Sequence, residues 1–262
     1  MVYFLYNKKM NIIPIPCLND NYAYVVHDND TKIIGVVDPS EALPIISFLK
    51  KNKLKLNYIL NTHHHFDHVG GNSELKKMYG AKVVGFYGDK HRIPGIDITL
   101  KDEEKWAFGK SVIKILHIPG HTLGHICFFF EKERIAFTGD TLFSLGCGKI
   151  FEGNHKQMLE SLNKIKKLPK NTKIYCGHEY TFKNAEFCLK HDNNNIDLKK
   201  KIKHIKKLRS ENLPTVPTSL EEELKSNIFL RCDKNDLKIK LKMKNDDDYK
   251  VFRKVRDLKD SF

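Results

Sequence analysis

Along the first two thirds of the chain, apolar residues come in short runs with turn residues between them. Runs of this length, bounded by Gly, Asn, Asp or Pro, are typical of β-strands. The segments 22–27 and 32–38 flank the turn signal Asp28-Asn29-Asp30, which predicts a hairpin. The same pattern predicts further strands over 56–61, 82–86, 111–117, 125–130 and 173–176.

Helical spacing of apolar residues appears between these strands. It predicts helices over 41–52, over 73–79 with Gly80 closing the helix, and over 155–168 with Pro169 after its end. After residue 178 the strand pattern fades, and the remaining helices are predicted over 182–191, 198–212, 220–226 and 249–258. The pattern therefore predicts an α/β domain over 1–178, followed by a small all-helical domain over 179–262.

The segment Lys234–Asp248 stands apart, because it is almost low-complexity, basic at first and then acidic. Such composition predicts a mobile loop.

Bulk composition favours a globular protein with a hydrophobic core over a membrane-spanning or exported protein. The chain has 262 residues, 40% of them hydrophobic, which is enough for a real core. No apolar run approaches the roughly 18 residues needed to cross a bilayer. The first nine residues put their charge after a short apolar stretch, the reverse of an export signal. The six cysteines form no C-x-x-C pair, which favours reduced thiols and a cytoplasmic location.

The formal net charge of +14 would concentrate anionic ligands near the protein. Nucleic acid is one such ligand, but the basic runs lack the interleaved aromatic residues of a stacking platform. We therefore interpret them as solvated helix faces, and we expect neither a nucleic-acid nor a membrane partner.

The segment NTHHHFDHVGGN, residues 61–72, crowds four histidines and an aspartate into six residues. Imidazoles this close repel one another when protonated and bury poorly unless they are paired. In an extended segment, residues two apart share a side, so His63 and His65 can point at one ion. Asp67 and His68 follow where the chain turns toward a helix and can reach a second ion. His64 and Phe66 are then spacers or core residues.

Three more candidates share one context, a strand followed by a small residue and then a ligand-type side chain. They are His121 in PGHT, Asp140 in TGDT and His178 in CGH. One allocation satisfies two ions: one held by His63, His65 and His121, the other by Asp67, His68 and His178, with Asp140 shared. Imidazole and carboxylate ligands suit zinc, iron or manganese, and residue type does not choose among them. His117 and His125 break the turn context and are expected to hydrogen-bond or pack.

With these motifs in view, the chain resembles the metallo-β-lactamase superfamily, and more narrowly glyoxalase II, the hydroxyacylglutathione hydrolases. THHHFDHVGGN, PGHTLGHI, GDTLFSLGCGK, CGHEY and the terminal FRKVRD carry the resemblance, which runs from about Ile12 to the end of the chain. It implies an αββα sandwich followed by a helical domain. The metal ligands it implies are the seven positions derived above, with zinc the expected metal.

The resemblance also implies the substrate, the thioester S-D-lactoylglutathione, which is hydrolysed to D-lactate and glutathione in methylglyoxal detoxification. The residues that it places at the substrate are His178, Lys149, Tyr180, Arg253, Arg256 and Phe151, the last standing where the family often has a tyrosine. Asp67 and Asp140 are the implied catalytic residues, acting on a hydroxide shared by the two ions. We expect a monomer or a weak homodimer.

Three other functions fit the same metal core. A lactonase or lactamase would not need the GCGK lysine together with the C-terminal arginines. A persulfide dioxygenase would use a single iron ion. An RNA-processing nuclease would bind its substrate with an affinity that falls steeply with salt.

Overall fold

A computed structural model describes residues 9–262 of the chain, which form two compact units. Unit 1 contains the residues up to Ile115 together with Phe128–Glu133, and unit 2 contains Leu116–Cys127 together with Arg134–Phe262. The expectation that the first nine residues carry no export signal falls outside the described part, apart from Lys9. Within residues 9–262, no helix combines the length and the apolar character that a membrane crossing requires.

Unit 1 is built on a six-stranded sheet in the order β1-β2-β3-β4-β5-β6. The pairs β1–β2 and β2–β3 are antiparallel, whereas the pairs β3–β4, β4–β5 and β5–β6 are parallel. The strands are β1 Met10–Cys17, β2 Asn21–Asp28, β3 Ile34–Val37, β4 Tyr58–Leu60, β5 Lys82–Phe86 and β6 Ile96–Leu100. The predicted hairpin is therefore present, and β6 is a strand that the sequence pattern did not indicate.

Helices α1 Leu43–Lys51, α2 Phe66–Val69 and α3 Asn72–Tyr79 follow β3 and β4 in the chain, and the 3₁₀ turn η1 Tyr87–Asp89 follows β5. The apolar side of α1 joins residues of β2, β3 and β4 in one buried cluster, in which Ile45 and Leu49 are fully buried. Gly80 ends α3 in the left-handed conformation, with φ 66°, as predicted. A hairpin of β7 Lys105–Phe108 and β8 Ser111–His117 completes this part of the chain.

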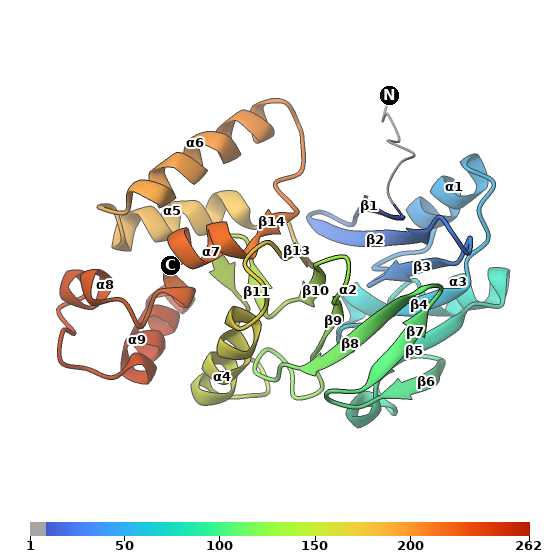
Figure 1. The fold of residues 1–262 in the computed structure, drawn as a ribbon, viewed down its shortest axis with the longest axis horizontal. Helices are drawn as coiled ribbons and strands as arrows, with labels where there is room; N and C mark the ends of the chain where they lie inside the picture. Colours follow the sequence, from blue (N-terminus) through green and yellow to red (C-terminus); the bar gives the residue numbers. More distant parts are fainter. Residues whose placement is uncertain (1–8) are drawn as a thin grey trace. The chain divides into compact units, whose positions relative to one another are not determined.

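Unit 2 combines strands with most of the helices (Figure 1). Strand β13 pairs parallel with β10 and antiparallel with β14, and β11 pairs with β12 in a short ladder. The strands here are β9 Ile126–Phe130, whose second half belongs to unit 1, β10 Ile135–Gly139, β11 Leu142–Phe143, β12 Gly146–Cys147, β13 Lys173–Cys176 and β14 Thr218–Ser219.

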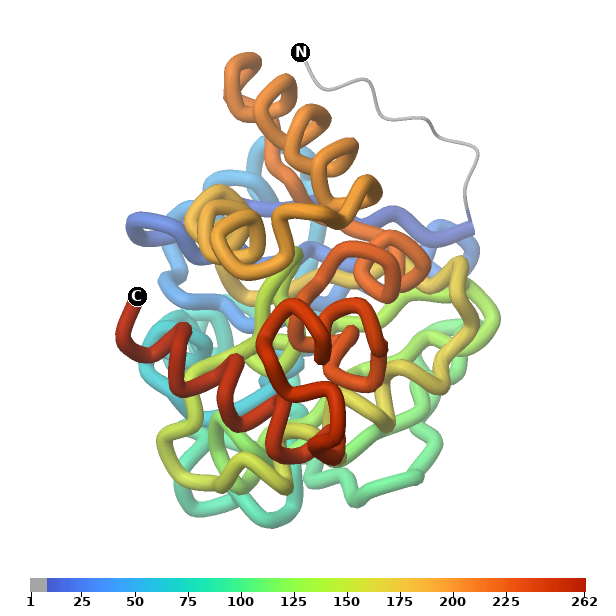
Figure 2. Tube along the Cα trace, turned by 90° about the vertical axis from the view of Figure 1, so that its left-hand side faces the viewer, coloured from blue at the N-terminus to red at the C-terminus, as the bar shows by residue number. Residues whose placement is uncertain are grey.

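Two helix pairs are visible in unit 2, α5 beside α6 and α4 beside α9 (Figures 1 and 2). The elements are α4 His155–Lys166, α5 Thr181–His191, α6 Ile196–Ser210, α7 Leu220–Ser226, η2 Ile228–Leu230, α8 Asn235–Lys240 and α9 Asp248–Asp260. All five helices predicted from residue 155 onward are therefore present, within a few residues of their predicted ends.

The prediction of a mobile loop over Lys234–Asp248 is wrong. Helix α8 lies inside this segment, and α9 begins at its last residue. Leu237 is completely buried, so the segment has an apolar anchor. Lys238 Nζ donates to the carbonyl of Asp246 over 3.0 Å and pairs with Asp248 Oδ1 over 2.7 Å. Some of the charged side chains whose abundance predicted a mobile loop therefore form local hydrogen bonds and ion pairs.

Candidate metal centre

In unit 1 the histidine cluster runs from the loop after β4 into α2, which contains His68. His63 and His68 are buried, and their ring centroids lie 4.2 Å apart, whereas His65 is half-buried at 4.8 Å from His63. Asp38 lies close to His63 and His68. The local pattern is the predicted one, an extended run into a helix that starts at Phe66.

Asp38, at the carboxyl end of β3, organises this loop. Its carboxylate accepts the backbone N–H of Thr62 over 2.8 Å and the Thr62 hydroxyl over 2.6 Å. The same carboxylate lies 3.0 Å from His68 Nδ1. Because a carboxylate accepts, the proton of His68 belongs on Nδ1, and Nε2 keeps the lone pair that a metal needs.

Asn21, the first residue of β2, hydrogen-bonds to Asp67 at the start of α2. Its Nδ2 donates to the backbone oxygen and to Oδ2 of Asp67, both over 3.0 Å. Asp67 Oδ2 also lies 3.6 Å from His68 Nε2. The carboxylate of Asp67, a predicted catalytic residue, is therefore oriented by the side-chain amide of Asn21 on β2.

The two residues predicted to be spacers or core have different surroundings. His64 Nδ1 lies 3.1 Å from Asp89, and His64 Nε2 lies 3.3 Å from Arg92 Nη1. Phe66 is 79% exposed, so the core interpretation is wrong for it. It starts the single-turn helix α2, whose buried residues are His68 and Val69.

Unit 2 brings together the other three predicted ligands. His121, Asp140 and His178 are all buried, although they come from three separate segments of the chain. Asp140 Oδ2 lies 3.2 Å from His178 Nε2 and 3.6 Å from His121 Nε2. The Nε2 atoms of both histidines thus face the same carboxylate oxygen.

Backbone contacts set the orientation of these side chains. His121 Nδ1 lies 2.7 Å from the carbonyl oxygen of Lys149, which can only accept, so the proton belongs on Nδ1 and Nε2 faces Asp140. The backbone N–H of Asp140 donates to His125 Nε2 over 3.0 Å. His117 Nε2 donates to the carbonyl of Leu123 over 2.8 Å. The predicted hydrogen-bonding roles of His117 and His125 are confirmed.

Three of the predicted substrate residues lie near His121 and His178 in unit 2. Phe151 is exposed, and its ring centroid is 5.2 Å from that of His121. The Lys149 ammonium lies 5.6 Å from the centre of the Phe151 ring. Tyr180 stacks on His178, with the ring centroids 4.6 Å apart and the planes 6° from parallel. An exposed cation and two aromatic rings therefore lie next to two buried histidines that are predicted ligands.

The two arginines of α9 differ in their surroundings. Arg253 is exposed, and its Nε lies 3.8 Å from Asp257. Arg256 is only 4% exposed, and its Nη1 donates to the carbonyl of Cys147 over 2.9 Å. The guanidinium of Arg256 is therefore engaged with backbone of its own unit.

The residue cluster of each unit offers the donors that divalent metals prefer. Each gathers buried imidazoles beside carboxylates, and in each a second hydrogen bond leaves the Nε2 of a histidine available as a ligand. Buried imidazoles at these separations could not all be protonated, whereas neutral rings bind metal. The His/Asp clusters support divalent metal binding, and the ligand types suit zinc, iron and manganese alike.

Comparison with known proteins settles the family. The family model for the metallo-beta-lactamase superfamily matches residues 18–178, and that for the hydroxyacylglutathione hydrolase C-terminus matches residues 179–262. A protein of Pelagibacter ubique named hydroxyacylglutathione hydrolase is 55% identical over 97% of this chain and 100% of its own length. The chain belongs to the hydroxyacylglutathione hydrolase family. A relative of the same name from Methylococcus capsulatus is 44% identical over 97% of this chain and 99% of its own length.

Solved structures agree on the fold of this family member. The crystal structure of ETHE1 from Myxococcus xanthus superposes with a TM-score of 0.65, covering 95% of this chain and 97% of that one, at 21% identity. The chain thus has the metallo-β-lactamase fold of mixed sheets with helices, followed by a C-terminal helical region, as the resemblance implied.

Sequence reasoning missed the residues that orient the predicted ligands. Asp38 directly follows a buried strand in the run VVDPS, as Asp140 follows β10, and this part of the signal was available although no small residue precedes Asp38. Asn21 had no such signal, because an asparagine at the start of a strand is ordinary in a turn.

Proposed function

We propose that this protein hydrolyses the thioester S-D-lactoylglutathione to D-lactate and glutathione, the glyoxalase II reaction of methylglyoxal detoxification. The observation that carries the proposal is the two-part family match over residues 18–262, supported by full-length relatives that bear the hydroxyacylglutathione hydrolase name. Residues 1–178 would carry the metal centre, and 179–262 would supply contacts to the glutathione part. We further propose a cytoplasmic monomer or weak homodimer that needs neither nucleic acid nor membrane.

The metal centre is proposed to be binuclear, with zinc as the metal and iron or manganese as alternatives. His63, His65 and His121 would hold one ion, Asp67, His68 and His178 the other, and Asp140 both. When bound, divalent ions supply Lewis acidity, which acidifies water and polarises a carbonyl group. The orientation of His68 by Asp38 and of His121 by the Lys149 carbonyl supports these assignments.

The residues of the chain then have separate tasks. Asp67, held by Asn21, accepts a hydrogen bond from the attacking water and orients it toward the thioester carbonyl. The Lys149 ammonium and the Arg253 guanidinium bind carboxylates of the glutathione part. Tyr180 is fixed by its stack on His178, and its hydroxyl is proposed to bind the peptide backbone of glutathione. Phe151 offers an apolar surface, since it lacks the hydroxyl of a tyrosine.

The decisive experiment is a thioesterase assay on S-D-lactoylglutathione combined with elemental analysis of the same sample. We expect turnover and close to two metal ions per chain. A single iron ion with consumption of oxygen and a persulfide would identify a dioxygenase instead. Hydrolysis of lactones or β-lactams without thioesterase activity would identify another hydrolase of the superfamily, and salt-sensitive cleavage of RNA would identify a nuclease.

Substrate binding by α9 can be tested with Arg253→Ala. Because Arg253 would touch a part of the substrate remote from the reacting carbonyl, KM should rise by about 10-fold while kcat stays within threefold. Lys254→Ala is the matched control, an exposed cation beside it on the same helix, and should leave both constants unchanged. An unchanged KM for Arg253→Ala would remove this residue from the binding site.

A further inference from the structure

The loop from Asp140 to Lys149, called the 140–149 loop below, connects a proposed metal ligand to a proposed substrate-binding cation. It contains β11 and β12, and the Gly148 N–H closes it by donating to the carbonyl of Thr141 over 3.2 Å. From Asp140 to Gly148 every residue is buried. The loop therefore depends on neighbouring side chains for its hydrogen bonds, since water cannot supply them.

The tip of the loop is held by Glu223 on α7, which is completely buried. Glu223 Oε2 accepts the backbone N–H of Leu145 over 2.8 Å. Leu145 has φ 58°, a left-handed conformation that a leucine seldom adopts, and its side chain is fully buried. The carboxylate thus stabilises an unfavourable backbone conformation at the turn.

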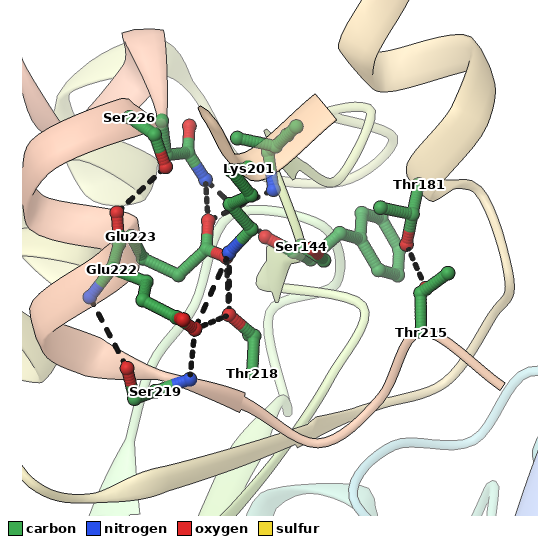
Figure 3. Close-up of polar contacts among 12 residues, drawn as sticks. Ser144, Thr181, Lys201, Thr215, Thr218, Ser219, Glu222, Glu223 and Ser226 are labelled. Atoms are coloured by element: carbon green, nitrogen blue, oxygen red, sulfur yellow. Dashed lines mark hydrogen bonds and ion pairs between the residues drawn. The ribbon is translucent and has the colours of Figure 1, made fainter. Parts of the chain in front are cut away.

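The other oxygen of Glu223 is fixed by two partners (Figure 3). Glu223 Oε1 accepts the Thr218 hydroxyl over 2.8 Å and forms an ion pair with Lys201 Nζ from α6. Because both partners approach Oε1, Oε2 remains directed at Leu145. The charge of this buried carboxylate is matched by a lysine whose side chain is only 9% exposed.

Two asparagines bind the carbonyl groups of the loop. Asn227 Nδ2 donates to the carbonyls of Phe143 and Gly146, over 3.2 and 3.1 Å, and also to Glu223 Oε2 over 3.0 Å. Asn184 of α5 donates to the carbonyl of Ser144 over 3.1 Å. Asn227, which lies between α7 and η2, therefore holds both strands of the small hairpin, and α5 holds the turn between them.

Arg256 of α9 holds the end of the loop that precedes Lys149. Its Nη1 donates to the carbonyl of Cys147 over 2.9 Å and to that of Gly148 over 3.4 Å. Its Nη2 donates to Asp260 over 3.0 Å, and the guanidinium lies 5.1 Å from the centre of the Phe229 ring. Since the guanidinium is buried and already binds these groups, its contacts favour a role toward the loop over a role toward substrate.

We propose that Glu223 and Arg256 are positioning residues that hold the 140–149 loop and thereby place Lys149 for binding the glutathione part of the substrate. The inference rests on the proposed function for its effect on catalysis, but the holding of the loop can be measured without substrate. Under this proposal, the C-terminal helices also shape the 140–149 loop, which lies in residues 18–178, the range that matches the metallo-beta-lactamase superfamily.

The test uses Glu223→Gln in the metal-loaded full-length protein. Glutamine keeps the size of the side chain, but its amide cannot accept on both sides, so either Leu145 or the Lys201 side loses its acceptor. Hydrogen–deuterium exchange without substrate should become at least about 10-fold faster in a peptide covering 141–149 and stay unchanged in unit 1. KM for S-D-lactoylglutathione should rise by about 10-fold, with kcat within threefold of wild type.

The matched control is Glu221→Gln, which removes an exposed carboxylate paired with Lys225 on the same helix. It should change neither exchange nor kinetics. Arg256→Lys is the second variant, because a lysine keeps the charge but cannot donate to Asp260 and to both carbonyls in the same geometry. Arg256→Lys should also speed exchange in the 141–149 peptide and raise KM. If Glu223→Gln does not fold, the result for Arg256→Lys alone decides whether the proposal holds.

Each outcome has one meaning. Unchanged exchange in the 141–149 peptide of both variants overturns the proposal, as does faster exchange spread evenly over the whole chain. If Arg256→Lys raises KM without changing exchange, Arg256 contacts substrate directly and its positioning role is wrong. If the wild-type protein does not hydrolyse the thioester, the proposed function fails, while the exchange data still decide whether these residues hold the loop.

Discussion

At the scale of single residues, the chemistry of each buried histidine depends on what its second ring nitrogen contacts. Asp38 faces Nδ1 of His68, and the carbonyl of Lys149 faces Nδ1 of His121. In both cases Nε2 is the proposed metal-binding atom. The aspartate and the carbonyl do not bind metal in the proposed centre, yet they select the tautomer on which the centre depends.

This dependence predicts the result of Asp38→Ala. Loss of the carboxylate leaves His68 without its orienting partner and Thr62 N–H without an acceptor, so metal affinity should fall by about 10- to 100-fold. Metal titration followed by elemental analysis measures the change. Asp28→Ala is the control, since the Asp28 carboxylate accepts the N–H groups of Asp30, Thr31 and Lys110 away from the histidine loop. It should lower stability and leave metal affinity unchanged.

Gly148 gives a second prediction at this scale. A Cβ added there would lie 1.8 Å from the carbonyl oxygen of Asp140 and 3.3 Å from His121 Nδ1, so the backbone of a proposed ligand would have to move. Gly148→Ala should therefore reduce bound metal well below that of the wild type, as measured by elemental analysis.

Gly80→Ala is the comparison for this prediction. A Cβ there meets nothing within 4 Å, and only its φ of 66° is unfavourable. It should cost about 1 kcal/mol of stability and leave the metal content unchanged. Equal metal content in the two variants would contradict the role given to the close contact at Gly148.

At the scale of elements, helix α4 shows how local sequence positions the loop of His121. Met158 on the buried face of α4 would meet a Cβ added at Gly120, so the helix packs directly against the turn before His121. Ser161 donates to the carbonyl of Pro119 over 2.6 Å. The start of α4 is set by a capping box, in which Asn154 accepts the N–H of Gln157 and Gln157 reaches back to Asn154 N–H.

The cap predicts the effect of Asn154→Ala. Removing the side chain leaves the N–H of Gln157 without the N-cap oxygen that accepts its hydrogen bond, and the unfolding free energy should fall by about 0.5–2 kcal/mol. Urea unfolding measures this. Glu160→Ala, at an exposed position on the same helix, should change the unfolding free energy by less than about 0.5 kcal/mol. If the two variants are equally stable, the capping box is not important for α4.

At the scale of the whole molecule, all six cysteines are buried and none forms a disulfide, as the sequence predicted. Burial raises the pKa of Cys17 to about 11 and the pKa values of Cys176 and Cys188 to about 12. In the unfolded chain these thiols ionise near pH 8.5. Their contribution to stability is therefore complete below that pH and is lost as the pH rises toward the folded-state values.

We therefore expect the unfolding free energy to fall steeply between pH about 8.5 and about 11. Urea unfolding at a series of pH values with the same metal content measures the slope. Cys127→Ala should show a shallower slope, because the fully buried Cys127 also has a raised pKa caused by burial. The same slope in both proteins would show that this thiol does not contribute to the alkaline instability.

Much of the element pattern follows from local sequence. Gly80 ends α3 because glycine adopts positive φ at little cost, and Pro169 follows α4 because proline cannot continue a helix. Alternating or helical apolar spacing is likewise a local property. The segment Lys234–Asp248 was mispredicted because its anchor is a single leucine, Leu237, whose burial depends on residues elsewhere in the chain.

The sequence by itself determined which residue types can bind metal and that they follow strands. Both properties depend only on neighbouring residues, in the motifs H-x-H-x-D-H, PGH, TGD and CGH. Only the tertiary structure decided which groups orient them. Asp38 faces His68 across 30 positions and Arg256 reaches Cys147 across 109. Contacts at such separations depend on how elements pack in space, and neither periodicity nor motif spacing carries that information.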